Sequence, residues 1–267
     1  MNTQKLIIAL VALAAAGLGL MTYTQDRAVD ESAAEPASDG QEAAVTQVPE
    51  GPVARITEEE LADGFVPLIG EWENGGFNKH GWNHYGPGYF TLDHEAGILT
   101  AHGGMGLLWH SELYGDFVLR LEFDTSVPES NSGIFLRVPN VPVSDDYIYH
   151  SFEIQIHDTA PEAIHQTGAV YDAEAPSTGA VQHTGGVFDA EAPARHRKHP
   201  PGQWHDMEIS FVGDLITVIL NGEKVIDWHA EPRGKVEDFA EQGFIGLQNH
   251  DWDTAVYFRN IRVKKLD

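Results

Sequence analysis

The 267-residue sequence contains no cysteine. Disulfide bonds and thiolate metal sites are therefore excluded, and so is a lipoprotein export signal, which needs a cysteine at its cleavage point. Basic residues are also few, because Lys and Arg number 16 against 41 Asp and Glu, which gives a formal net charge of −25. Such a charge repels nucleic acids and anionic membrane surfaces, so neither is an expected partner. It also keeps a protein soluble without any part in function.

Long apolar runs are absent except at the N-terminus, where Lys5 precedes an apolar stretch at residues 6–21. This length suits the core of a signal peptide and is short for a helix that spans a bilayer. Residues 1–23 are therefore expected to be a signal peptide. The alternative is an uncleaved N-terminal anchor, because no clean Ala-x-Ala cleavage site follows. Such an anchor would be the one expected contact with a membrane. Both alternatives predict export to the periplasm, the membrane surface or the medium.

Residues 24–60 are rich in Ala, Glu, Asp, Gln, Ser and Pro and carry few large apolar side chains. Such a segment cannot bury enough surface to offset its chain entropy. It is expected to be a flexible acidic linker. At its end, Thr57 is predicted to cap one helical turn over residues 56–61.

Residues 61–267 consist of short runs of β-forming residues separated by Gly, Asn, Asp and Pro. Strands are predicted at 89–93, 98–102, 107–111, 117–125, 133–138, 151–157, 204–212, 215–220, 224–228, 244–249 and 255–264. Asn221-Gly222 is a two-residue hairpin signal, because both positions favour positive φ. Many short strands without an amphipathic helix predict an all-β fold, a jelly-roll sandwich of two antiparallel sheets.

The run at residues 151–157 alternates between two faces of a strand. Its apolar side chains share one face: Phe152, Ile154 and Ile156. The opposite face carries Glu153, Gln155 and His157. A row of polar side chains suits an open binding groove, and it also suits the water-facing side of an antiparallel sheet.

One segment is repeated: residues 167–176, Thr-Gly-Ala-Val-Tyr-Asp-Ala-Glu-Ala-Pro, recur with two changes at residues 184–193. A period seen only twice indicates a local duplication inside a long loop. Only one copy can occupy the ancestral position.

Several motifs occur in a characteristic order: Asn-Ser-Gly-Ile-Phe-Leu-Arg at 131–137, Phe-Glu-Ile-Gln-Ile-His-Asp at 152–158, Thr-Gly-Ala-Val-Tyr at 167–171, Pro-Gly-Gln-Trp at 201–204, Leu-Asn-Gly at 220–222, Gly-Phe-Ile-Gly-Leu-Gln-Asn-His at 243–250 and Phe-Arg-Asn-Ile at 258–261. Together they resemble the 3-keto-disaccharide hydrolase domain family over residues 65–266. The family's opening Phe-Asn-Gly-Lys-Asp-Leu-x-x-Trp is only loosely matched at 68–72. The first copy of the repeat has the better motif and the second the expected spacing to 201–204, so either could line the site.

This resemblance implies a concanavalin A-like jelly roll and an exported bacterial protein that acts on carbohydrate. A ketone at sugar carbon 3 acidifies the proton at carbon 2, so the glycosidic oxygen can leave by elimination before water adds. The route needs a base, an acid and a group that stabilises the enolate. Glu153, His157 and Arg137 are the predicted catalytic residues, with Arg137 reaching over from the neighbouring strand. Alternatively, Arg137 and Glu153 form only a cross-strand ion pair.

Further residues are predicted to bind the substrate by holding hydroxyls or stacking on a sugar ring: Asn131, Gln155, Asp158, Tyr171, Gln248, His250 and Trp109, with Trp82 as another stacking candidate. A tryptophan in a sandwich is, however, more often part of the core. The 14 histidines show no metal-ligand spacing, and no cofactor is firmly implied. A divalent cation bound by Asp158, Glu153 or Asp172 stays open.

Two other functions fit the same strand. Jelly-roll glucanases use the motif Glu-x-Asp-x-x-Glu, so Glu153 could be a nucleophile and Asp158 an acid/base about 5 Å away in a retaining mechanism. Gln155 replaces the central aspartate of that motif, and Asp158 is shorter than the final glutamate. The third function is a lectin-like module that binds carbohydrate without turnover, which needs only donors and stacking rings.

Overall fold

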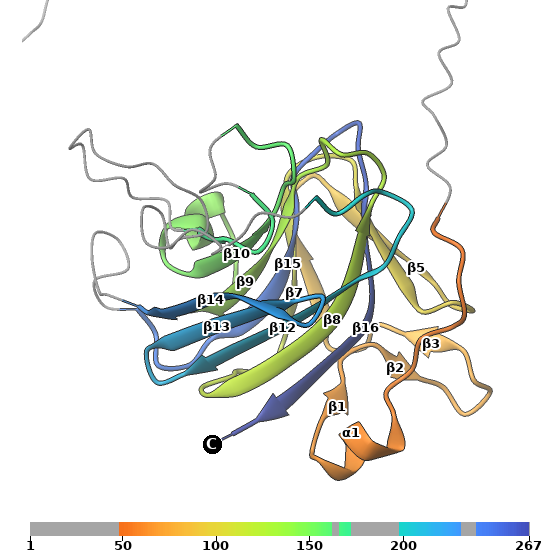
Figure 1. Ribbon diagram of the computed structural model, residues 1–267, viewed down its shortest axis with the longest axis horizontal. Coiled ribbons are helices and arrows are strands. Elements are labelled where there is room, and N and C mark those ends of the chain that lie inside the picture. The colour runs from red at the N-terminus through yellow and green to blue at the C-terminus, as the bar shows by residue number, and fades with distance from the viewer. Residues whose placement is uncertain (1–47, 162–165, 172–197, 231–238, 267) are drawn as a thin grey trace, which may run out of the picture. The chain divides into compact units, whose positions relative to one another are not determined.

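The computed structural model describes residues 48–161, 166–171, 198–230 and 239–266, all within one compact unit, Glu42–Asp267. Two antiparallel sheets pack face to face in it (Figure 1). The β8 sheet contains, in spatial order, β14 (Glu223–His229), β13 (Leu215–Leu220), β12 (His205–Val212), β8 (Phe117–Thr125), β16 (Val256–Lys265), β6 (Ile98–His102) and β5 (Tyr89–Asp93), and β1 (Val66–Pro67) also pairs with β16.

The β10 sheet contains β11 (Val170–Tyr171), β10 (Phe152–Ile156), β9 (Ser132–Val138), β15 (Phe244–Asn249), β7 (Gly106–His110) and β4 (Trp82–Tyr85). A small ribbon joins β2 (Gly70–Glu71) to β3 (Phe77–Asn78). The jelly-roll prediction is therefore confirmed, and every strand predicted from the sequence is present. The strands that the sequence did not predict have only two to four residues, too few for alternation to be recognised.

The core fills the space between the two sheets. β8 contributes four alternate side chains that are almost completely buried, as its pattern predicts: Phe117, Leu119, Leu121 and Phe123. Ile134 and Ile154 face them from the β10 sheet and belong to the same apolar cluster. Burying a side chain of this size contributes about 1.5–3 kcal/mol, so this cluster fixes which face of each strand points inward.

The predicted hairpin turn and helix cap are both confirmed. Asn221 and Gly222 have φ of 50° and 79° and join β13 to β14. Helix α1 (Glu58–Ala62) begins after Thr57, whose side chain accepts a hydrogen bond from the Glu60 N–H. The Glu60 carboxylate accepts one from the Thr57 N–H in return, which completes a capping box.

The folded domain begins before residue 61. The Arg55 guanidinium pairs with Glu71 at 3.0 Å, and Arg259 donates to the Pro52 carbonyl at 3.1 Å. Glu60 pairs with Arg262 at 2.7 Å. Residues 52–60 therefore pack on the sandwich, whereas residues 1–47, with the expected signal and most of the expected linker, lie outside the described residues. Within the described ranges, no helix has the length and apolarity needed to cross a membrane.

Candidate active site

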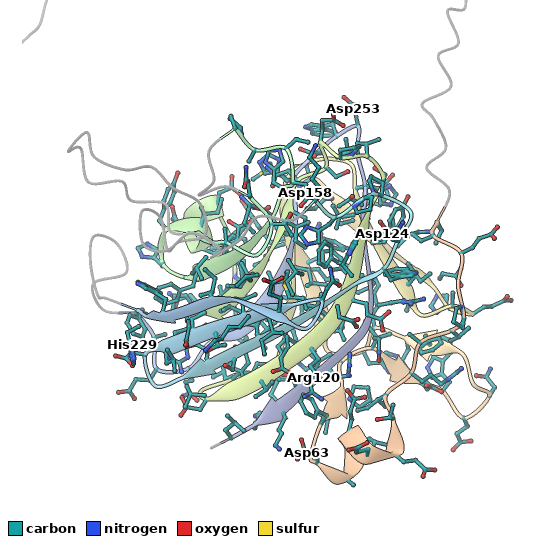
Figure 2. The ribbon with its side chains drawn as sticks, viewed as in Figure 1. Asp63, Arg120, Asp124, Asp158, His229 and Asp253 are labelled. Atoms are coloured by element: carbon teal, nitrogen blue, oxygen red, sulfur yellow. The ribbon has the colours of Figure 1, made fainter. Side chains whose placement is uncertain are left out.

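The site lies at one end of the β10 sheet. Because β9 runs antiparallel to both β10 and β15, the start of β9 meets the ends of β10 and β15 at that edge. Figure 2 shows Asp158, just after β10, and Asp253, in the loop after β15, at the same end of the sandwich. Sequence segments about a hundred residues apart are thus brought together.

A pocket of about 310 Å³ opens at this end. Its lining includes most of the predicted site residues: Asn131, Glu153, Gln155, His157, Gln248 and His250. The lining is completed by four residues that no sequence pattern indicated: Met105, Ile148, Ala160 and Pro161. The pocket is small but within the range of small-molecule sites, and its polar groups converge from three strands.

Glu153 lines this pocket from the outer face of the β10 sheet. It pairs in register with Phe135, which belongs to an apolar cluster on that outer face, separate from the core. The Glu153 side chain folds over Gly133 of β9, where an added Cβ would overlap the carboxylate. Glycine at 133 is therefore required for Glu153 to lie where it does.

Glu153 is a buried acid without a charge partner in the described ranges. Its side chain is 3% exposed, and its Oε1 has no hydrogen-bond partner among the described residues. Burial raises the pKa of Glu153 to about 8. The carboxyl group therefore keeps its proton at neutral pH, and its ionised form is a stronger base than an ordinary carboxylate.

A short 3-10 helix, η1 (Asp145–Tyr149), covers Glu153. Tyr147 of this helix packs edge-on against Phe135, with ring centroids 5.0 Å apart, and Ile148 lines the pocket. Burial raises the pKa of Tyr147, and the nearby Glu153 adds to that shift. Tyr147 thus belongs to the surroundings of Glu153, although nothing in the sequence indicated it.

Three buried side-chain oxygens of the pocket residues lack a hydrogen-bond donor within the described part of the chain: Asn131 Oδ1, Glu153 Oε1 and Gln248 Oε1. Buried acceptors without donors are costly and uncommon in folded proteins. Donors from a ligand, such as the hydroxyl groups of a sugar, would satisfy them. The pocket therefore suits a polyhydroxylated molecule.

His250 is oriented by its neighbour Asp251, a pairing that the sequence analysis did not find. The His250 Nδ1 lies 2.7 Å from Asp251 Oδ1, and Asp251 Oδ2 accepts from the Asn131 N–H at 2.9 Å. Burial alone would raise the pKa of Asp251, but hydrogen bonds from His250, Thr254 and Asn131 hold it below its usual value. An ionised carboxylate thus fixes the imidazole and leaves its Nε2 for a ligand.

Arg137 does not lie in the pocket, and its predicted catalytic role is wrong. It adopts φ of 52° at the far end of β9, where the pairing with β15 shifts register. Its guanidinium lies over the Phe211 ring at 3.6 Å and pairs with Asp116 at 3.0 Å. It also donates to the carbonyls of Gly115 and Gly213. This bulge breaks the alternation from which a shared face with Glu153 was predicted, and it excludes the ion pair between them as well.

Asp158 does not line the pocket either. Its Oδ1 binds the His199 Nδ1 at 2.8 Å, and its Oδ2 accepts from the His199 backbone N–H. Burial would raise the pKa of Asp158, but the hydrogen bond and charge of His199 lower it. Of the residues described, only Glu153 brings a carboxylate to the pocket, so the carboxylate pair of a glucanase-like mechanism is not found.

The tryptophans predicted as stacking platforms are structural. Trp109 is 8% exposed and packs against Phe244, with ring centroids 4.8 Å apart. Trp82 is partly buried against the core and donates its indole N–H to the Leu68 carbonyl at 2.7 Å. Neither lines the pocket, so neither can stack on a ligand there.

The first copy of the repeat borders the site. Val170 and Tyr171 form β11 and pair with Ile154 and Glu153 of β10. Thr167 Oγ1 accepts from the His157 N–H at 2.9 Å, so this copy also fixes the end of the strand. The second copy lies outside the described residues, and stacking by Tyr171 stays a prediction.

A metal site gains no support from the arrangement of the described residues, where no group of three His, Asp or Glu side chains is placed to hold an ion. Asp172, one of the three ligands left open by the sequence, lies outside them. Asp158, the second, is paired with His199. Glu153 alone of the three faces the pocket.

An antiparallel jelly roll with a polar pocket beside the ends of its strands places the chain among the concanavalin A-like sandwiches. Residues 64–264 match the sequence model of the 3-keto-alpha-glucoside-1,2-lyase-like domain, and the chain belongs to this family. The resemblance to 3-keto-disaccharide hydrolases is thereby confirmed, and the family is a carbohydrate-related glycosidase family. No curated protein sequence matches the chain significantly.

Two solved structures from Parabacteroides distasonis, each described as a candidate glycosyl hydrolase, resemble the chain. The first is 25% identical with a TM-score of 0.57, over 76% of this chain and 99% of that protein. The second is 22% identical with a TM-score of 0.58, over 79% of this chain and 98% of that protein. The second likeness shows the fold alone.

Proposed function

We propose that the protein cleaves glycosides of 3-keto sugars by eliminating the alcohol across carbons 1 and 2, with addition of water to the product as a second step. The observation that carries this proposal is Glu153, a buried carboxyl group with an unpaired oxygen in a pocket formed by a chain of this family. Elimination needs one base of this kind, whereas a retaining glycosidase needs a second carboxylate close by.

The atoms of the reaction balance without a cofactor. The base removes the proton at carbon 2, and its electron pair moves into an enolate that includes the ketone at carbon 3. The enolate then re-forms the ketone while a double bond forms between carbons 1 and 2, and the bond from carbon 1 to the glycosidic oxygen breaks. An acid protonates that oxygen, and the alcohol leaves. Water can then add its hydroxyl to carbon 1 and its proton to carbon 2.

Glu153 is the proposed base. Because its pKa is about 8, its ionised form is basic enough to remove a proton that a neighbouring ketone acidifies. His250, held by Asp251, and His157 are the proposed acids for the leaving oxygen. The side-chain amides of Asn131, Gln155 and Gln248 take over the enolate contact that the sequence had assigned to Arg137.

The test compares a glucoside with its 3-keto derivative, each incubated with the purified protein and followed by NMR. We expect the 3-keto glucoside alone to release its alcohol, and Glu153→Gln to abolish release. Glu95→Gln, on the exposed loop after β5, is the matched control and should retain full activity. Cleavage of the plain glucoside would favour the glucanase-like route, and binding without cleavage of either would favour a lectin-like module.

We also propose that the protein is exported. The proposal is supported by the basic residue and the apolar run at residues 5–21. Residues 1–60 fused to a reporter that is active only outside the cytoplasm should give an active reporter. A silent reporter, with the fusion shown to be expressed, would contradict export.

A further inference from the structure

An exposed tryptophan lies next to the pocket and has no part in the mechanism above. Trp252 is 69% exposed and follows His250 and Asp251 directly in the loop after β15. Tyr89, at the start of β5, is 50% exposed. A single exposed aromatic side chain is ordinary on a protein surface, but these two rings pack against neighbouring residues of one backbone segment.

This segment is a pair of consecutive glycines with positive φ, Gly103 at 79° and Gly104 at 105°. A Cβ at Gly104 would lie 2.7 Å from the Trp252 indole, and a Cβ at Gly103 would overlap the Tyr89 ring. Both rings therefore rest directly against backbone that no side chain covers. Met105, the next residue, lines the pocket, so the two glycines connect the pocket to these two rings, Trp252 and Tyr89, which together form an aromatic shelf.

Hydrogen bonds hold the shelf in position relative to the pocket. The Gly104 N–H donates to the Asp251 carbonyl at 2.9 Å. The Asp251 carboxylate in turn binds His250 and the Asn131 N–H, and both of these residues line the pocket. The Asn249 amide donates to the Tyr89 carbonyl at 3.4 Å and to that of His102. The end of β15 and the loop after it, which contribute His250 to the pocket, are thus hydrogen-bonded to the segments that position the two aromatic rings.

We propose that the shelf binds the second ring of a disaccharide substrate, with Trp252 as the main contact, while the pocket holds the 3-keto ring. This inference rests on the proposed function. A pocket of about 310 Å³ is at the lower limit for small-molecule sites, so the second ring of a disaccharide can extend beyond it. An uncharged aromatic surface suits the C–H face of a neutral sugar ring.

The test separates substrates by length. Trp252→Ala should raise KM for 3-keto-trehalose about tenfold with little change in kcat, because contacts remote from the reacting atoms bind ground state and transition state alike. Methyl 3-keto-α-glucoside, which lacks the second ring, should be cleaved as by the wild type. Trp252→Phe should restore most of the affinity. Trp72→Ala is the matched control, since Trp72 is 42% exposed but stacks on His94 beside the β2–β3 ribbon.

An equal rise in the KM of Trp252→Ala for both substrates, or no rise for 3-keto-trehalose, would contradict the proposed role of the shelf. If the wild type cleaves neither keto substrate, the proposed function fails while the shelf can still be tested by binding. In that case, titration with trehalose and with methyl α-glucoside, followed by tryptophan fluorescence, should show tighter binding of trehalose that Trp252→Ala abolishes. Equal affinity for the two sugars would then overturn it.

Discussion

Replacing Glu153 by Gln should change the pH dependence of stability in a calculable way. The pKa of Glu153 is raised from 4.5 to about 8 in the folded protein by burial. Below pH 4.5 both the folded and the unfolded states hold the proton. Between pH 4.5 and 8 only the unfolded state is ionised, so rising pH favours unfolding by about 1.4 kcal/mol per unit. Above pH 8 both states are ionised, and the stability lost through this group no longer changes with pH.

From pH 5.5 to 7.5 the wild type should therefore lose roughly 2–3 kcal/mol of stability through this one group. Glu153→Gln cannot ionise, so its free energy of unfolding should gain that amount relative to the wild type over the same interval. Urea denaturation at the two pH values measures the difference, and other titrating groups cancel because both proteins share them. A difference that does not vary with pH would show that Glu153 ionises normally, and the reason for choosing it as the base would be lost.

Four further outcomes are expected. Ile154→Ala should cost about 2–5 kcal/mol in urea denaturation by opening a cavity in the core, while the folded fraction keeps its kcat. Gly133→Ala should lower kcat about a hundredfold with the fold intact by circular dichroism, because its Cβ displaces the Glu153 carboxylate. Arg137→Ala should reduce stability by about 1–3 kcal/mol, since it leaves the carbonyl of the buried Gly115 without its donor, and a fall in kcat of the folded enzyme would contradict its structural assignment. The kcat/KM for a 3-keto glucoside should rise with pH up to about 8, and a fall over that range would make Glu153 an acid instead.

The strands could be predicted because each is long enough to show its own alternation. β8, for example, has nine residues, with buried apolar side chains at four alternate positions, and β13 and β14 are joined by a turn whose two residues tolerate positive φ. β11 has only two residues, and it is a strand because β10 offers it a free edge. Such strands depend on their neighbours, so the local sequence does not reveal them.

The pocket residues could be predicted for the same reason, as long as alternation holds. The alternation of side chains along residues 151–157 places Glu153, Gln155 and His157 on one face, and all three line the pocket. The rule fails at Arg137, where a left-handed residue changes the direction of the side chain. The sequence Arg-Val-Pro at 137–139 gives no glycine or asparagine to signal such a bulge. Only the pairing with β15 reveals it.

The chemistry of Glu153 depends on a contact that alternation cannot describe. On the strand pattern alone its face is the polar one, and a carboxylate in water would keep an ordinary pKa. In the folded protein, η1 lays Tyr147 and Ile148 over that face, and the side chain is 3% exposed. Burial, rather than a neighbouring charge, then moves its pKa to about 8. The strand therefore supplies the carboxyl group, and the covering helix gives it the raised pKa on which the proposed elimination depends.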